Sequence, residues 1–307
     1  MPRLAYLGPE GTFTEEALRL LDPTAERLPC ASVSAALNAA RAGDADGAVV
    51  PLENSIEGAI TTTLDEFAWG EPLMINAELL LPVRFSLLAR PGTDIPHIKR
   101  VYTHPAAITQ CRAYVSRELP DAVVVAAPST AAAAQEVALP GSPYDAAIAA
   151  PIAGEHYGLV ELASDVGDRS DTVTRFVKVG RPGAALPEAT GSDRTTLVVF
   201  LADDRPGALL EMLTEFSVRG VNLTRIESRP TGDGIGRYFF HFDFEGHVAD
   251  ARVGEALSGL HRIAGEVRFL GSYPRADGVA PQVKRGTSDG EFAEAGDWLA
   301  RIRAGRL

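Results

Sequence analysis

Four segments of the chain combine polar side chains with turns, a pattern typical of small-ligand binding. In residues 8–14, GPEGTFT, a glycine-rich turn leads into a helix, so the backbone amides of Gly11 and Thr12 are candidate donors to an anion. The same segment could be a tight turn that Thr12 or Thr14 caps. It has no Lys-Ser/Thr pair, so it does not predict a P-loop.

The second segment is PLENSIEG at residues 51–58, where an acid, an amide and a hydroxyl follow one another at Glu53, Asn54 and Ser55. These three side chains could bind a carboxylate or a hydroxyl group. They could equally form an Asx turn followed by a helix cap. The residues alone leave both interpretations open.

The third segment is Thr103-His104-Pro105, followed by Gln110 and Cys111. A histidine at the end of a strand suits acid–base chemistry. Alternatively, Thr103 or His104 caps a helix that has Pro105 in its first position. No histidine stands at motif spacing from Cys111, so we do not expect nucleophilic catalysis by its thiol.

The fourth segment is DTVTRF at residues 171–176. Alternation along a strand would place Thr174 and Phe176 on one face and Arg175 on the other. The sequence has no HExxH or CxxC spacing, and no GxGxxG follows a strand. We therefore predict neither a metal site nor a nucleotide cofactor.

An α/β fold must position these segments. Residues 1–180 alternate short apolar strands with helical runs, which indicates a mostly parallel sheet covered by helices. The alternation runs through two similar cycles, which predicts two lobes. We expect Pro51 to end the strand at residues 46–52. Residues 173–179 form a late strand that could return to the first lobe and leave a cleft between the lobes.

The C-terminal part has a different pattern. Residues 182–193 are rich in Pro, Gly, Ala and Ser, which predicts a linker. Residues 194–274 follow the order βαββαβ, the ferredoxin-like arrangement, with a turn at residues 231–234. Residues 275–307 are expected to form a largely flexible tail with one short helix at residues 291–302.

Charge and composition exclude several classes of partner. The formal net charge of −12 disfavours nucleic acid and anionic membranes, which attract clustered Lys and Arg. Two cysteines are too few for a secreted disulfide framework. No signal peptide is recognisable, and no stretch reaches the roughly 18 apolar residues of a membrane span. We therefore expect a cytoplasmic protein.

In this order, GPEGTFT, PLENSIEG, THP with QC, Ser129-Thr130 and DTVTRF resemble the prephenate dehydratase family over residues 1–181. Residues 194–274 resemble an ACT domain through GALL at residues 207–210 and ESRP at residues 227–230. No long-helix region like a chorismate mutase module precedes them, so the resemblance implies the monofunctional form. It also implies a catalytic region of the periplasmic-binding-protein type. Its first lobe would contain residues 1–77 and 160–181, and its second lobe residues 78–159.

The resemblance implies a carbon–oxygen lyase that converts prephenate to phenylpyruvate, water and carbon dioxide. Aromatisation supplies the thermodynamic pull, so no cofactor is implied. Thr174 would protonate the departing hydroxyl. A free threonine hydroxyl is a very weak acid, so an oriented hydrogen-bond donor describes Thr174 better. Asn54, Gln110 and Glu53 would complete the catalytic set. Substrate-binding candidates are Gly11, Thr12, Ser55, Thr103, His104, Ser129, Thr130, Arg175 and Phe176.

The ACT resemblance implies feedback by L-phenylalanine. Pro206 suits a first helical position, and small residues after it would let the ligand's carboxylate reach the helix N-terminus. A partner subunit would contribute Asn222 and the ESRP segment, so we expect a homodimer or homotetramer. The effector candidates are Gly207, Ala208, Leu209, Leu210, Asn222, Glu227, Ser228, Arg229 and Pro230. The alternatives are an arogenate dehydratase and a non-catalytic amino-acid sensor. One departure from relatives is Pro128, which replaces an acidic residue before the Ser-Thr pair.

Overall fold

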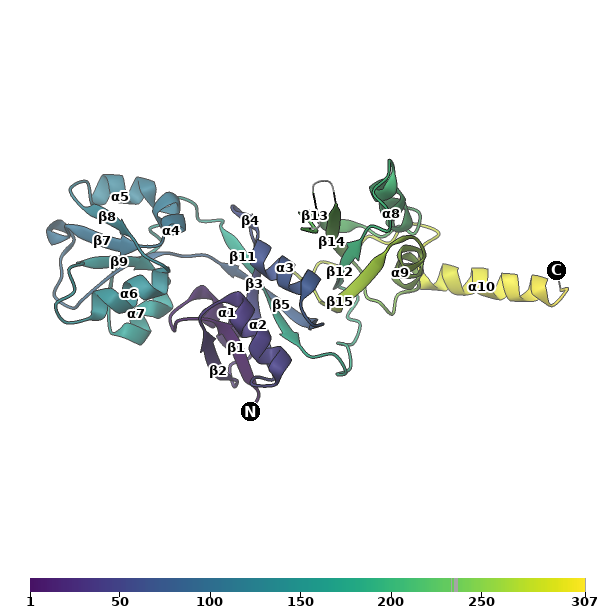
Figure 1. Ribbon diagram of the computed structural model, residues 1–307, viewed down its shortest axis with the longest axis horizontal. Helices are drawn as coiled ribbons and strands as arrows, with labels where there is room; N and C mark the ends of the chain where they lie inside the picture. Colours follow the sequence, from purple (N-terminus) through teal and green to yellow (C-terminus); the bar gives the residue numbers. More distant parts are fainter. Residues whose placement is uncertain (233, 235–236, 307) are drawn as a thin grey trace. The chain divides into compact units, whose positions relative to one another are not determined.

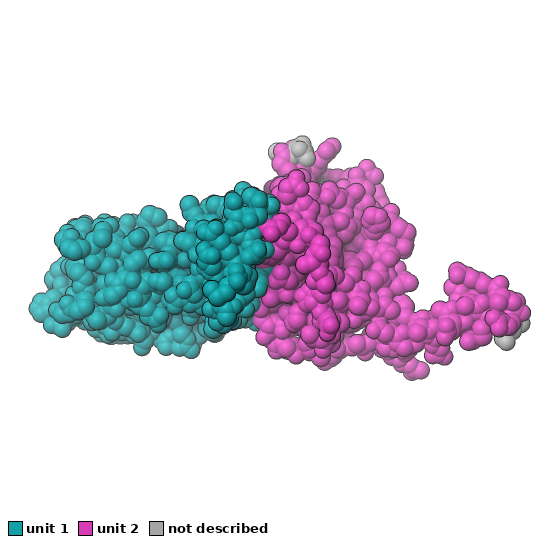
Figure 2. All heavy atoms as spheres, turned by 90° about the horizontal axis from the view of Figure 1, so that it is seen from below, with its two compact units in different colours: residues 1–63, 79–178 teal, residues 64–78, 179–307 magenta. Residues whose placement is uncertain are grey.

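The computed structural model describes residues 1–232, 234 and 237–306 (Figure 1). Its contacts divide the chain into two compact units, which Figure 2 colours separately. Unit 1 comprises residues 1–63 and 79–178, and unit 2 comprises residues 64–78 and 179–307.

The first lobe is built on a six-stranded sheet with the strand order β2-β1-β3-β11-β5, and β4 pairs with β3. Its core contains Leu4, Tyr6, Leu18, Val49 and Phe176. The strands are β1 (Arg3–Leu7), β2 (Glu26–Cys30), β3 (Gly47–Asn54), β4 (Gly58–Ala59), β5 (Met74–Pro82) and β11 (Val173–Gly180). The helices are α1 (Phe13–Leu21), α2 (Val33–Ala42) and α3 (Thr61–Trp69).

Strand β3 continues through Pro51 to Asn54, so the expectation that Pro51 ends this strand is wrong. The reason is the limited pairing of β3 with its neighbour β1, which extends only as far as Val49. Pro51 lies beyond that ladder, so its missing amide removes no hydrogen bond to β1. The extra length carries Asn54 to the end of the sheet.

The second lobe is a five-stranded sheet with the strand order β10-β6-β9-β7-β8. Helices α4 and α5 cover one face of it and α6 and α7 the other (Figure 1). The strands are β6 (Ser86–Ala89), β7 (Arg100–Thr103), β8 (Val123–Ala126), β9 (Ala146–Ala149) and β10 (Val160–Ala163). The helices are η1 (Ile95–His97), α4 (Pro105–Gln110), α5 (Arg112–Glu118), α6 (Thr130–Ala138) and α7 (Pro151–Tyr157).

Strand β11 returns to the first sheet, where it lies between β3 and β5. The chain therefore passes between the two sheets twice, once after β5 and once before β11. This confirms the two-lobed α/β fold that the sequence predicted. It also brings the DTVTRF segment next to the end of β3.

Unit 2 contains a four-stranded antiparallel sheet with the strand order β13-β14-β12-β15. Phe216, Phe242 and Phe244 form the centre of its core. The predicted βαββαβ order is confirmed; Asp233 of the predicted turn lies outside the described residues. The elements are β12 (Asp193–Phe200), α8 (Ala208–Ser217), β13 (Leu223–Pro230), β14 (Tyr238–Glu245), α9 (Ala251–Ile263) and β15 (Glu266–Pro274).

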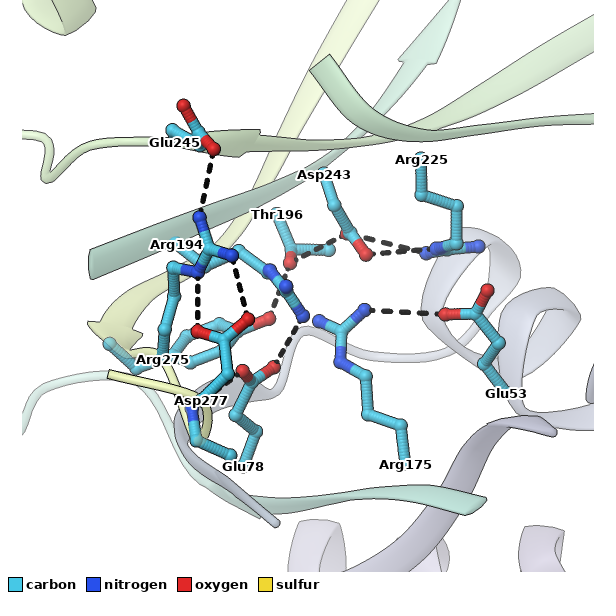
Figure 3. Close-up of polar contacts among 12 residues, drawn as sticks. Glu53, Glu78, Arg175, Arg194, Thr196, Arg225, Asp243, Glu245, Arg275 and Asp277 are labelled. Atoms are coloured by element: carbon cyan, nitrogen blue, oxygen red, sulfur yellow. Dashed lines mark hydrogen bonds and ion pairs between the residues drawn. The ribbon is translucent and has the colours of Figure 1, made fainter. Parts of the chain in front are cut away.

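Residues 64–78 belong to unit 2, although the sequence suggested that residues up to 77 belong to the first lobe. The indole of Trp69 packs edge-on against Phe200 and Phe239, with ring centroids 5.1 and 5.4 Å apart. Glu78 forms an ion pair with Arg194, with 2.8 Å between Oε2 and Nη1 (Figure 3). The C-terminal part of α3 and the start of β5 therefore pack with the βαββαβ sheet.

Two helix starts in unit 2 differ from the sequence interpretation. Helix α8 begins at Ala208 and is capped by Gly207 at φ +87°, so Pro206 precedes the cap and does not take the first helical position. Near the C-terminus, α10 (Asp289–Arg303) is longer than the short helix expected there. A reciprocal capping box between Ser288 and Glu291 fixes its start.

Candidate active site

A cavity of about 340 Å³ in unit 1 receives side chains from both lobes. Eight residues proposed from the sequence line it: Thr12, Asn54, His104, Gln110, Ser129, Thr130, Thr174 and Phe176. The sequence interpretation did not include Leu7, Phe13, Thr14, Pro51, Glu57, Ile60, Val83, Phe85, Ala106, Ala107 and Pro128, which also line it.

A hydrogen bond between two buried side chains forms part of the cavity wall. The Nδ2 of Asn54 donates to the Oγ1 of Thr174 at 2.9 Å. The Oδ1 of Asn54 accepts from the backbone amides of Ile56 and Glu57, at 2.9 and 3.0 Å. These two amides fix which way the Asn54 side chain is turned, because only its oxygen can accept. The NH₂ group must therefore point at Thr174.

This orientation determines what Thr174 can do. Its oxygen accepts a hydrogen bond from Asn54, so its own proton is free to point elsewhere. Thr174 is 8% exposed and lines the cavity, so a ligand there is the available acceptor. The Asn54 amide also stabilises negative charge on the threonine oxygen. The pair is suited to donate a hydrogen bond to a departing hydroxyl.

A second bridge joins the two lobes at the cavity. The Nε2 of Gln110, in the second lobe, donates to the Oε1 of Glu57, in the first lobe, at 3.0 Å. Glu57 follows the PLEN residues by three positions, and the sequence interpretation did not select it. Its partner, Gln110, lies 53 positions away in the sequence. No local sequence pattern could therefore reveal the role of Glu57.

The glycine-rich turn is held by a buried carboxylate. The Gly11 amide donates to Oε2 of Glu15 at 2.7 Å, so this amide already has an acceptor within the chain. Gly11 has φ +84°, and a Cβ there would lie 2.9 Å from Cα of Ala153 in the second lobe. The other Glu15 oxygen lies 2.9 Å from Nε2 of His156, also in the second lobe. The turn therefore ties the lobes together, and glycine is required in it.

The hydroxyls of two proposed residues cap helices. Thr12 accepts from the Glu15 amide at 3.2 Å and donates to the Leu7 carbonyl at 2.9 Å. Ser129 accepts from the Ala132 amide at 3.0 Å. His104 likewise caps α4, because its Nδ1 accepts from the Ala106 amide at 3.2 Å. That bond leaves Nε2 as the ring nitrogen that can carry the proton.

Five proposed residues are not among those that line the cavity: Gly11, Glu53, Ser55, Thr103 and Arg175. Thr103 is fully buried, and its hydroxyl donates to the Ile148 carbonyl at 2.6 Å. The Ser55 hydroxyl accepts from the Val173 amide at 3.0 Å, and the Ser55 amide donates to the Val173 carbonyl at 2.9 Å. Ser55 thus fixes the end of β3 against β11, which places Asn54 opposite Thr174.

Glu53 and Arg175 point away from the Asn54–Thr174 pair and do not line the cavity. Arg175 is 4% exposed, and its Nη1 lies 3.7 Å from Oε2 of Glu53 (Figure 3). Each residue is adjacent in sequence to a member of the pair, and neighbours along a strand face opposite sides. This geometry confirms that Arg175 and Thr174 lie on different faces.

Cys111 is fully buried at the end of α4. Burial raises the pKa of its thiol to about 12. A thiol with that pKa stays protonated at neutral pH and is a poor nucleophile. The structure therefore agrees with a chemistry that does not use this cysteine.

The proposed effector residues lie in unit 2. Gly207, Ala208, Leu209 and Leu210 form the start of α8, where Leu210 is 67% exposed. The ESRP residues end the edge strand β13. Arg229 forms a bidentate ion pair with Asp65 of α3. Its Nη2 donates to Oδ2 at 2.7 Å, and its Nε donates to Oδ1 at 3.0 Å.

Comparison with known proteins now decides the family. A family model described as prephenate dehydratase matches residues 4–184, and a model described as the ACT domain matches residues 195–262. The chain belongs to the prephenate dehydratase family. A prephenate dehydratase from Amycolatopsis methanolica is 49% identical over 306 residues, which cover 99% of each chain. One from Mycobacterium tuberculosis is 45% identical and covers all of this chain and 95% of its own.

Solved structures match most of the chain. The crystal structure of prephenate dehydratase from Arthrobacter aurescens in complex with L-Phe is 51% identical, with a TM-score of 0.93. The match covers 98% of this chain and 99% of that one. A structure described as GqqA, a novel type of quorum-quenching acylase, is 31% identical with a TM-score of 0.79, covering 88% and 97%.

No group of three or more His, Cys, Asp or Glu side chains among the described residues is placed to hold a metal ion. None of the helices in that part of the chain has the length and apolar character that a membrane crossing needs.

Proposed function

We propose that this protein is a prephenate dehydratase that uses the cavity of unit 1 as its active site. The observation that carries the proposal is the hydrogen bond from Asn54 to Thr174, because it leaves the threonine proton free to point into the cavity. Membership of the prephenate dehydratase family supports the same assignment.

The reaction needs one well-placed donor. The bond from the ring to its carboxylate breaks, and its electron pair moves through the ring toward the carbon that bears the hydroxyl. The C–O bond then breaks, and the hydroxyl leaves as water while carbon dioxide departs. The proton that this needs passes through the Thr174 hydroxyl, which regains one from solvent water. Thr174 hydrogen-bonds to the oxygen that gains negative charge, and this stabilises the transition state.

The substitutions Thr174→Val and Thr174→Ser test this role. Valine has the shape of threonine without the hydroxyl, so we expect kcat to fall by about 10²–10³-fold with a small change in KM. Serine keeps the hydroxyl and should retain much of the activity. The proposal fails if Thr174→Val keeps the wild-type kcat. It also fails if the purified wild-type protein forms no phenylpyruvate, as expected for a sensor or an acylase.

Arogenate is the second candidate substrate, and one observation favours it. Glu57 is the only Asp or Glu side chain among the described residues that line the cavity, and a carboxylate there could pair with the ammonium of arogenate. Comparison of kcat/KM for the two substrates, in wild type and in Glu57→Gln, separates them. A wild-type preference for arogenate that Glu57→Gln abolishes would overturn our choice of prephenate.

We further propose that unit 2 senses L-phenylalanine and pairs with a second subunit. The L-Phe complex of the Arthrobacter aurescens relative supports the effector. The edge strand β13 supports pairing, since it exposes Ile226 at 45%. Light scattering of Ile226→Lys should report smaller particles than wild type, and an unchanged mass would exclude this edge. The proposal also includes a cytoplasmic location, the binding of phenylalanine at residues 207–210, and assembly as a dimer or tetramer.

A further inference from the structure

Two helices begin at the wall of the cavity, one from each lobe. Helix α1 follows Thr12 in the first lobe, and helix α6 follows Ser129 in the second. Each has nine residues, long enough for a developed dipole at its N-terminus. The residues that surround both helix starts, 12–14 and 128–130, line the cavity.

Each helix start leaves two backbone amides unused. In α1, the Glu15 amide is capped by the Thr12 hydroxyl, and the Glu16 amide donates to the Thr12 carbonyl. The preceding amides, of Phe13 and Thr14, have no acceptor within the described part of the chain. Both amides lie at the positively polarised end of the helix, which favours an anion.

Helix α6 repeats this arrangement in the other lobe. The Ser129 hydroxyl accepts from the Ala132 amide, and the Ser129 carbonyl accepts from the Ala133 amide. No acceptor for the amides of Thr130 and Ala131 is found among the residues that the structure describes. Each lobe therefore contributes to the cavity one helix N-terminus whose backbone amides can bind an anion.

An independent observation at α1 points to a ligand. The Thr14 side chain is 96% buried, since only 4% of the residue is exposed, and it lines the cavity. Its hydroxyl forms no hydrogen bond with any described residue. That hydroxyl is not among the buried polar atoms that lack a partner, so its oxygen is part of the small exposed fraction of Thr14 and is open to the cavity. A ligand atom in the cavity would supply the missing partner.

The side chains that line the cavity limit how an anionic ligand can be bound there. None of the described residues that line the cavity is Lys or Arg. Apart from the His104 ring, the donors that this wall offers to a dicarboxylate are therefore neutral. Two helix ends in different lobes match a substrate with two separate carboxylates.

We propose that the ends of α1 and α6 each hold one of the two carboxylates of the substrate, and that Thr14 donates its hydroxyl to the carboxylate at α1. This inference rests on the proposed function. The use of neutral donors suits the reaction, because one carboxylate loses its charge as it becomes carbon dioxide. A bound cation would stabilise that charge most in the ground state and so oppose the step.

Matched substitutions at the two helix ends test the inference. Thr14→Val and Thr130→Val remove a hydroxyl without a large change of shape, and Thr14→Ser and Thr130→Ser keep it. We expect Thr14→Val to raise the KM for prephenate about ten- to hundredfold, as for loss of a hydrogen bond to a charged group. Its kcat should stay within about threefold of wild type. Thr14→Ser should restore KM.

The product provides the second readout. Phenylpyruvate keeps only one of the two carboxylates, so Thr14→Val and Thr130→Val should not weaken product inhibition equally. A wild-type KM in Thr14→Val, or an equal rise of the phenylpyruvate inhibition constant in both valine variants, would overturn the inference. If wild type forms no phenylpyruvate, the proposed function has failed. Calorimetric titration of the same variants with prephenate then still tests the two helix ends.

Discussion

The side-chain amide of Asn54 donates a hydrogen bond to the hydroxyl of Thr174 across two neighbouring strands, at 2.9 Å. The same side chain accepts hydrogen bonds from two backbone amides of the turn that follows β3. Asn54 therefore has two separable functions: its oxygen holds the turn and its nitrogen holds the threonine.

Asn54→Asp separates these functions. Aspartate still accepts the two turn amides but cannot donate to Thr174, so the threonine proton would turn toward the new carboxylate. We expect kcat to fall about 10²–10³-fold while the melting temperature stays close to wild type. Asn54→Ala, the control, should lose both activity and about 1 kcal/mol of stability. Steady-state kinetics and thermal unfolding check both, and a wild-type kcat in Asn54→Asp contradicts the assignment.

Glu53→Gln should leave catalysis nearly unchanged, although Glu53 stands next to Asn54. Its side chain faces Arg175 and does not line the cavity. We expect kcat and KM to stay within about twofold of wild type, as for substitutions outside a site. Glu57→Gln is the matched control, and it should alter KM because Glu57 lines the cavity. A tenfold loss of kcat in Glu53→Gln would restore Glu53 to the catalytic set.

His241 predicts a loss of stability in acid. Burial in the β14 face, with a smaller contribution from Arg225, lowers its pKa from 6.5 to about 3. The folded state therefore prefers the neutral ring. Its contribution to stability is complete above pH 6.5 and is lost as the pH falls toward 3.

Between pH 6.5 and 5 this loss amounts to about 2 kcal/mol. His241→Leu removes the titrating group, so its free energy of unfolding should fall less than that of wild type between pH 7 and pH 5. Urea unfolding at the two pH values measures the difference. Parallel losses in the two proteins would show that His241 does not titrate in this way.

Asp65→Asn should weaken the response to phenylalanine without lowering basal activity. Asp65 holds Arg229 of the ESRP segment through two hydrogen bonds, and α3 also carries Thr63, whose hydroxyl donates to the Pro51 carbonyl in β3. We expect the inhibitory concentration of phenylalanine to rise about fivefold or more. Glu266→Gln, which breaks an exposed pair with Arg268, is the control. Equal inhibition in Asp65→Asn and wild type would remove α3 from the coupling.

The sequence predicted features that local periodicity determines. Alternation placed Thr174 and Arg175 on opposite faces, and the two cycles of strands and helices predicted two lobes. Hydrogen-bond partners that are distant in the sequence could not be predicted from it. Thr103 donates to Ile148, 45 positions away, and Gln110 donates to Glu57, 53 positions away. The role of Gly11 was also obscured, because its amide binds a buried carboxylate one helical turn later.

The absence of Lys and Arg from the described residues of the cavity wall has a consequence for the rate of substrate capture. The protein carries a net charge of −12, and no Lys or Arg among the described residues lines the cavity to attract an anion. Protein and dianionic substrate therefore repel each other at long range, and dissolved ions screen that repulsion. The second-order rate constant for encounter should increase with ionic strength. A site that captured its substrate with arginine would show the opposite dependence.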